Sequence, residues 1–366
     1  MVPIRPIGIP ALTIITKNNT TMKRYILSAM ALLLGAVATS AQQTVMGTTY
    51  FLPKTALRFA VTIEKTSYTP GQFAMYATRY MKKTGVALQP TVSYRITDIS
   101  MVPVGVPDSA KQHTLSLEKR LSITEIDRDE SGILLGINAK GHATVLPQPF
   151  KPAPKTPQLN PKDYMNEDIL SAGSTAKMAE LTAKDIYDIR DSRAQLSRGQ
   201  ADFMPKDGAQ LRLMMDNLDT QERALLQVFE GVTTRDTTQT IVTYVPTREA
   251  GQAVLFRFSQ KLGLTDSDDL AGSPYYIRVA PDNDLKDEAP SEKAKDNFGL
   301  CVNIPDKIQI DLEHQGRVVK HFECYAGQFG KTEYLSADLF GKKNTAHITL
   351  NPVSGSIEKI ESETLK

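Results

Sequence analysis

The chain has 366 residues, of which 23% are charged and two are cysteine, and its formal net charge is only +2. A near-neutral chain lacks the basic surface of a nucleic-acid-binding protein. Outside the amino-terminal region, no segment approaches the roughly 20 apolar residues that a membrane-spanning helix needs. We therefore expect no nucleic-acid partner and no transmembrane span, and a chain long enough for two domains of roughly 100 to 200 residues.

Residues 22–41 have the three parts of a secretory signal peptide. Lys23 and Arg24 form the positive start, residues 26–37 are a short apolar run, and residues 39–41 offer small side chains at a cleavage site. The apolar run is too short to span a bilayer as a stable helix. These residues predict an exported protein.

We interpret residues 1–21 as an upstream mis-start outside the fold, and we expect the mature protein to begin near Gln42. From there the chain has 39 basic and 41 acidic residues, a net charge of −2. No cysteine directly follows the signal, so the usual lipid attachment is missing. The mature protein is expected to be soluble or held by partners.

Residues 42–145 predict a β-rich domain with one short helix. Alternating apolar residues from Leu57 to Ile63 predict a strand with one buried face. Residues 69–72, Thr-Pro-Gly-Gln, have the N-cap, the proline and the glutamine of a helix start, and apolar residues up to Tyr80 then share one helical face. Further strands are expected at 92–96, 115–117, 123–126 and 133–137, the last two flanking a turn at 129–132.

Six prolines between Leu146 and Pro161 predict an extended arm or linker, which we place at residues 146–172. A helical hairpin is expected to follow at 173–232. Ser174 can cap its first helix, which should end at Gly199, and the second helix should run from about Gly208 to Gly231. Leu211, Met214, Met215, Leu218, Leu225, Val228 and Phe229 should face inward as core, although a methionine-rich stripe can also be an adaptable binding surface.

Residues 233–366 predict a second antiparallel β domain. The charged segment 280–297 has no apolar period and is expected to be a loop. The candidate strands are residues 241–245, 254–258, 275–279, 302–304, 308–312, 318–324 and 347–350. The predicted fold class is therefore α+β, with two β-rich, sandwich-like antiparallel domains and a two-helix hairpin between them.

No motif in the chain dictates a reaction. The sequence has no GxSxG, no HExxH and no phosphate-binding glycine loop, and its histidines at 113, 142, 314, 321 and 347 are scattered. His321 could face Asp311 across a hairpin turning at Gln315-Gly316 and form a base with its orienting carboxylate, but a slip of one residue would separate them. An envelope hydrolase that uses this pair or two carboxylates on a glycan or peptide is one alternative function.

Asp266, Asp268 and Asp269 concentrate oxygen ligands in one loop, as a calcium site requires. The loop lacks the glycine and the distal glutamate of an EF-hand, and turn-forming roles explain the same residues. We expect no metal and no cofactor, and keep a calcium-stabilised, adhesin-like module as a second alternative.

Cys301 and Cys324 could form a disulfide in an oxidising compartment, although the predicted hairpin places Cys301 beyond the strand that faces Cys324. The other interpretation is two buried, inert thiols. Tyr275 and Tyr276 could stack on a sugar ring, but aromatic residues in a strand also belong to a core.

Five stretches stand out together: TPGQFAMYATRYM at 69–81, AKDIYDIRDSR at 183–193, LFRFSQKLGLTDSDDLAGSPYYI at 255–277, YAGQFGKTEYLSADLFG at 325–341 and NPVSGSIEKI at 351–360. They resemble a family of exported proteins of unknown function from Gram-negative gut anaerobes. The resemblance implies the periplasm or cell envelope as the location and assigns no catalytic residue. We expect an exported, non-catalytic envelope protein that binds another protein or a glycan.

Overall fold

The computed structural model describes residues 47–116, 121–155, 157–249, 251–283, 285 and 300–364. The predicted mis-start, the signal peptide at 22–41 and most of the predicted loop at 280–297 lie outside the described residues. Among the described helices, none is both long and apolar enough to cross a membrane.

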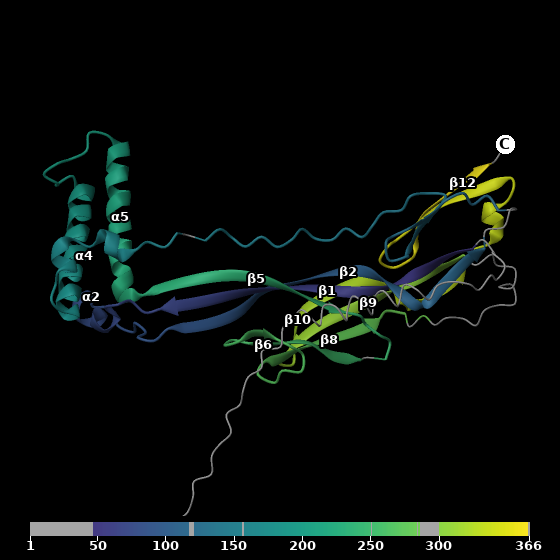
Figure 1. Ribbon diagram of the computed structural model, residues 1–366, viewed down its shortest axis with the longest axis horizontal. Helices are drawn as coiled ribbons and strands as arrows, with labels where there is room; N and C mark the ends of the chain where they lie inside the picture. Colours follow the sequence, from purple (N-terminus) through teal and green to yellow (C-terminus); the bar gives the residue numbers. More distant parts are fainter. Residues whose placement is uncertain are drawn as a thin grey trace, which may run out of the picture. The chain divides into compact units, whose positions relative to one another are not determined.

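The described strands form three antiparallel sheets (Figure 1). The first has the order β2 (Thr91–Ser116), β1 (Gly47–Thr69) and β5 (Val232–Tyr244). The predicted alternation in β1 is confirmed, since Leu57, Phe59, Val61 and Ile63 are buried. Two short strands were expected at 92–96 and 115–117, but residues 92–96, 115 and 116 all belong to β2, which pairs with β1 over most of its length. Pro103 and Pro107 do not interrupt β2 because it is an edge strand, where a missing backbone N–H is tolerated.

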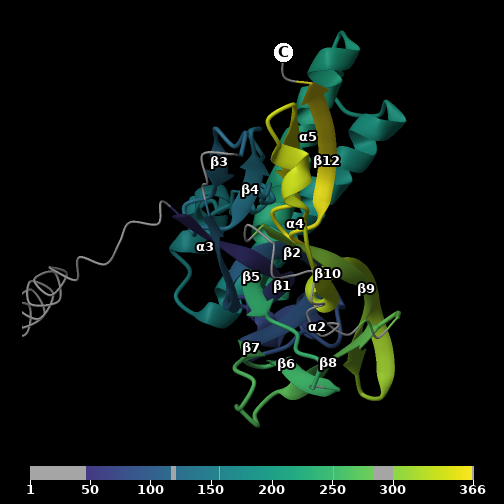
Figure 2. The ribbon, with the colours of Figure 1, turned by 90° about the vertical axis from the view of Figure 1, so that its right-hand side faces the viewer.

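The second sheet has five strands, of which Figure 2 shows β6, β7 and β8 side by side. Its order is β10 (Arg317–Tyr334), β9 (Cys301–His314), β8 (Ser273–Pro281), β6 (Gln252–Ser259) and β7 (Gly263–Thr265). A buried cluster joins it to the first sheet, with Phe59 and Val61 of β1 packed among Ile277, Ile308 and Ile310. This packing is sandwich-like and brings β1, from the first predicted β-rich segment, against strands of the second.

The third sheet has the order β12 (Ile357–Thr364), β11 (Asn344–Leu350), β4 (Leu134–Ile137) and β3 (Ile126–Arg128), and a short helix, η4 (Ala337–Phe340), precedes β11. β3 and β4 flank the predicted turn, in which Asp129 Oδ1 accepts a hydrogen bond from the backbone N–H of Ser131 at 2.9 Å. Because β4 pairs with β11 and β1 pairs with β5, the two predicted β-rich segments share two of the three sheets.

The helical hairpin is α4 (Thr175–Arg198) and α5 (Gly208–Glu230), which confirms the β-rich α+β fold class. Ser174 Oγ accepts from the backbone N–H of Lys177 at 3.2 Å, and Gly199 ends α4 with a positive φ of 71°, as expected. Leu225, Val228 and Phe229 are buried, but Met214 and Met215 are only half-buried. No residue of α5 before Glu222 is buried, so the hairpin core lies in the carboxyl-terminal half of this helix.

The short helix after β1 starts later than expected. It consists of η1 (Ala74–Tyr76) and α2 (Ala77–Met81), and neither has a side-chain cap. Thr69 belongs to β1, and the backbone N–H of Phe73 donates to Val228 O at 2.6 Å. The Thr-Pro-Gly-Gln stretch was therefore wrongly predicted as a capping box, because it binds the end of α5 instead.

Candidate functional site

His321 and Asp311 are register partners on β10 and β9, and His321 Nδ1 lies 2.7 Å from Asp311 Oδ1. The fold thus selects the register that the sequence left open. The row continues to Arg278 on β8, which pairs with Asp311 across the sheet. The His321 side chain is 54% exposed, and this row contains no hydroxyl or thiol that the imidazole could activate.

The aspartate loop forms a turn. Asp269 Oδ1 accepts from the backbone N–H of Ala271 at 2.9 Å, and Asp266 O accepts from the Asp269 N–H at 3.1 Å. The guanidinium of Arg257 donates to Ser267 O at 2.8 Å, which holds a cation against the loop. In the part of the chain that the structure describes, no three His, Cys, Asp or Glu side chains group as metal ligands would. Asp266, Asp268 and Asp269 therefore do not form such a group.

The two cysteines are far apart and are not bridged to each other. Cys324 lies opposite Ile308 on β9, and seven residues separate Ile308 from Cys301 on the same strand. At roughly 3.3 Å per residue this is about 20 Å, whereas a disulfide needs Cα atoms within about 7 Å. The predicted possibility of a disulfide is thus corrected. Burial raises the pKa of the Cys324 thiol to about 11, so it is a poor nucleophile at neutral pH.

Tyr275 has no open ring face for a sugar. Its ring centroid is 4.7 Å from that of Phe256 on β6 and 4.1 Å from that of His314 on β9, with interplanar angles of 21° and 9°. These three residues are register partners across neighbouring strands, so the rings stack as a ladder. Tyr276 points to the opposite side of β8, as alternation requires.

A buried polar cluster that no sequence pattern predicted lies where the three sheets meet. We call it the junction, and it consists of Pro53, Thr55, Asn303, residues 327–330 and residues 353–355. Asn303 is 1% exposed, and its Nδ2 donates to Pro53 O and to Ser354 O, both at 2.9 Å. The Gln328 amide bonds both the N–H and the C=O of Thr55 at 2.8 Å. The GQFG and NPVSG stretches supply Gln328 and Ser354, so two of the five recognisable stretches contribute to the contact between the three sheets.

A second missed cluster lies on the hairpin, where the Glu222 carboxylate is buried. Arg190 Nε donates to one oxygen at 2.6 Å and Arg193 Nη1 to the other at 2.8 Å. Arg193 also pairs with Asp219, and Arg193, Asp219 and Glu222 line a hollow of about 500 Å³. Their charges compensate one another, and the cluster therefore fastens α4 to α5.

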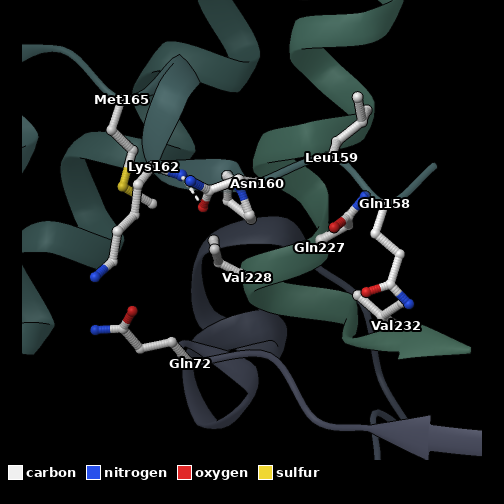
Figure 3. A pocket seen from close by; sticks show the side chains of 10 residues that line it. Gln72, Gln158, Leu159, Asn160, Lys162, Met165, Gln227, Val228 and Val232 are labelled. Atoms are coloured by element: carbon white, nitrogen blue, oxygen red, sulfur yellow. Dashed lines mark hydrogen bonds between the residues drawn. The ribbon is translucent and has the colours of Figure 1, made fainter.

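An open groove of about 470 Å³ lies at the carboxyl-terminal end of α5 (Figure 3). It is lined by Gln72, Gln158, Leu159, Asn160, Pro161, Lys162, Met165, Gln227, Val228 and Val232. These residues come from the loop before η1, from the end of the proline arm with the short helix η2 (Pro161–Tyr164) and the residue after it, which precedes α3 (Glu167–Leu170), and from the end of α5 and the start of β5. Three segments that are distant in the sequence thus meet here.

Close backbone contacts hold the groove walls. A Cβ on Gly71 would lie 2.2 Å from Val228 O, so only glycine allows the loop to approach α5 this closely. On the other wall, Asn160 Oδ1 accepts from the Lys162 N–H at 3.3 Å, and its Nδ2 donates to Asp163 at 2.8 Å. The asparagine before Pro161 therefore caps η2 in the usual way.

Four polar side chains of the groove lining have no partner among the described residues. Within the described residues, the amides of Gln72, Gln158 and Gln227 form no hydrogen bond, and the Lys162 ammonium forms no ion pair. Figure 3 shows Lys162 and Gln72 reaching toward one end of the groove, Gln158 and Gln227 lying at the other end, and Val228 between them. Since an amide both donates and accepts, the groove offers polar ends and an apolar floor.

The chemistry available in the groove is binding. The described residues of its lining include no Ser, Cys, His, Asp or Glu, and thus no nucleophile with a base beside it. One residue in the sequence could have indicated this groove. Gln72 occupies the glutamine position of a predicted capping box, but its side chain caps no helix.

A family model described as "Domain of unknown function (DUF4831)" matches residues 46–358 of the chain. No curated protein and no solved structure matches the chain.

Proposed function

Because the chain belongs to the DUF4831 family, whose description assigns no activity, we propose from its own geometry that it is an exported, non-catalytic protein of the Gram-negative cell envelope. It binds a short polar ligand, part of an envelope protein or glycan, in the groove at the end of α5. The observation that carries this proposal is the set of three unpaired glutamine amides over an apolar floor. Ligand sites combine such a floor with a few convergent polar groups.

The remaining candidate groups support a non-catalytic role. Tyr275 is stacked on both sides, the Asp269 carboxylate forms a turn, and the buried Glu222 carboxylate is held by two arginines. Each of these groups already has a structural partner. In the groove, three glutamine amides have no such partner among the described residues.

The first experiment is thermal unfolding of the mature chain from Gln42, with and without envelope peptides, glycans, muropeptides and calcium. A ligand at 100 times its dissociation constant stabilises a protein by about 2.7 kcal/mol, so the melting temperature should rise. The triple variant Gln72→Ala/Gln158→Ala/Gln227→Ala should melt as the parent does without ligand but lose the shift. Gln200→Ala, on the exposed loop between α4 and α5, is the matched control and should keep it.

The proposal fails if no compound shifts the melting temperature, or if the triple variant responds like the parent. A calcium shift that a chelator removes would instead favour the calcium-stabilised, adhesin-like module.

A second candidate, the envelope hydrolase, is favoured by the His321–Asp311 contact of 2.7 Å. If it is correct, incubation with muropeptides or glycans should release products, and His321→Asn should abolish the release. Product formation that survives this change would exclude the pair as the base.

Export has its own test. Cells expressing the full chain should yield a protein that begins near Gln42 in the envelope or periplasmic fraction. An uncleaved chain in the cytosol would contradict export without affecting the groove.

A further inference from the structure

The two ends of the groove differ in charge. Among the described residues, Lys162 is the only charged one in the lining, and it forms no ion pair with a carboxylate. The Asp163 carboxylate accepts from Asn160 at 2.8 Å and Glu230 pairs with Lys83 at 2.6 Å, and neither forms an ion pair with Lys162. The end formed by Lys162 and Gln72 therefore favours an anionic group, to which an ammonium and an amide can both donate.

The middle of the groove is apolar. Val228 and Met165 are buried and form its floor, and Val232 lies toward the far end. Beyond them, Gln158 and Gln227 each present one acceptor oxygen and two donor hydrogens. A ligand that fills the groove should thus carry an anion, then an apolar side chain, then a group that both donates and accepts hydrogen bonds.

A peptide ending in a free carboxylate has these three features in this order. Its peptide groups match glutamine amides, which donate and accept in the same way. A glycan matches less well, because the described residues of the lining include no aromatic ring on which a sugar could stack.

We propose that the groove captures the carboxyl-terminal end of a short peptide, with Lys162 and Gln72 at the terminal carboxylate and Gln158 and Gln227 at a peptide group further back. This assignment rests on the proposed binding function and names the ligand class. Lys162 and the three glutamines are the positioning residues, and no bond is made or broken.

The test uses two pools of fluorescein-labelled random tetrapeptides, one with free carboxylates and the other with terminal amides. Fluorescence anisotropy measures the affinity of each pool for the mature chain. We expect the free-acid pool to bind about tenfold more tightly, the typical worth of one hydrogen bond to a charged group. Lys162→Gln should remove this difference, and Lys162→Arg should retain it.

Lys151→Gln is the matched control, because Lys151 is an exposed lysine of the proline arm outside the groove. It should leave both affinities unchanged. Lys162→Gln should also melt as the parent does, since its ammonium has no ion-pair partner among the described residues.

Equal binding of the two pools, or a difference that persists in Lys162→Gln, would overturn the ligand class and leave the binding function standing. Binding of a uronate-bearing oligosaccharide in a Lys162-dependent manner, with no binding of either peptide pool, would replace peptide by acidic glycan. If neither pool, nor the oligosaccharide, nor the thermal-unfolding panel binds, the proposed function itself fails.

Discussion

The junction and the groove are built alike, but polar side chains are hydrogen-bonded in the junction and three amides lack partners in the groove. Each joins segments that are distant in the sequence, and each needs a glycine where two backbones meet. At the junction, Asn303 is buried and both of its amide atoms have partners, including Lys111 at 3.4 Å on the oxygen. In the groove, three amides are left open. A buried polar group must be paired, so only the open set is free to recognise another molecule.

The largest expected effect is at the junction glycines. A Cβ on Gly330 would lie 1.8 Å from Ile304 O, a backbone atom that cannot move without disturbing β9. Gly330→Ala should lower the free energy of unfolding by more than about 3 kcal/mol or prevent folding. Gly341→Ala is the control, because its Cβ would meet its nearest atom, Asp338 O, at 3.7 Å. Similar urea midpoints for the two variants would refute the close packing of the junction.

Asn303→Ala should rank second. It leaves the carbonyls of Pro53 and Ser354 buried without their donor, which costs about 2–3 kcal/mol. Asn217→Ala, at an exposed position of α5, should change the free energy of unfolding by less than about 0.5 kcal/mol. Urea denaturation checks both, and a loss at Asn303 no larger than at Asn217 would mean that water satisfies the junction.

The ends of the two hairpin helices could be predicted from the sequence, because short local signals determine them. Ser174, Gly199 and Gly231 delimit the hairpin because caps and left-handed glycines act within a few residues. Strand pairing could not be predicted from the sequence, because the contacts β1–β5 and β4–β11 join residues more than 150 positions apart. His321 and Asp311 show the limit clearly: both residues were identified, but only the packed sheet fixes their register.

The groove was invisible for a related reason. Gln72, Gln158 and Gln227 lie in three separate segments, and each reads as an ordinary surface glutamine. A polar residue exposed in a loop carries no sign of which others it will meet. The Thr-Pro-Gly-Gln stretch was singled out, but as a helix cap, because its actual partner is more than 150 residues away in α5.

Gly71→Ala tests the rigid wall of the groove and should rank third. Its Cβ would meet Val228 O at 2.2 Å, but the loop is exposed on its outer side and can retreat from α5. We expect a loss of about 1–2 kcal/mol in the free energy of unfolding, together with loss of ligand binding, because Gln72 moves with the loop. Denaturation and peptide anisotropy measure the two effects. Retained binding would show that the groove does not need this wall.

The smallest expected effect concerns His347. Its ring nitrogens have hydrogen-bond partners, as the polar groups of the junction do, but its side chain is partly exposed, as the side chains of the groove are. Its Nδ1 lies 2.6 Å from Asn138 O and its Nε2 3.3 Å from Glu363 Oε2, and the hydrogen bond to the carbonyl, followed by that to Glu363, raises the pKa of His347. The folded state therefore holds this proton more tightly than the unfolded chain. The added stability is present below pH about 6.5 and is lost as the pH rises through the raised pKa.

Urea midpoints measured from pH 5.5 to 8.5 should fall more steeply for the parent than for His347→Gln. Because the side chain is 35% exposed, solvent screens it and the difference should be the smallest of the four. Added salt should weaken the Glu363 part and spare the hydrogen bond to the Asn138 carbonyl. Identical pH profiles would mean that an exposed group with hydrogen-bond partners contributes as little to stability as an exposed group without them. Burial, and not pairing, would then be what distinguishes the junction from the groove.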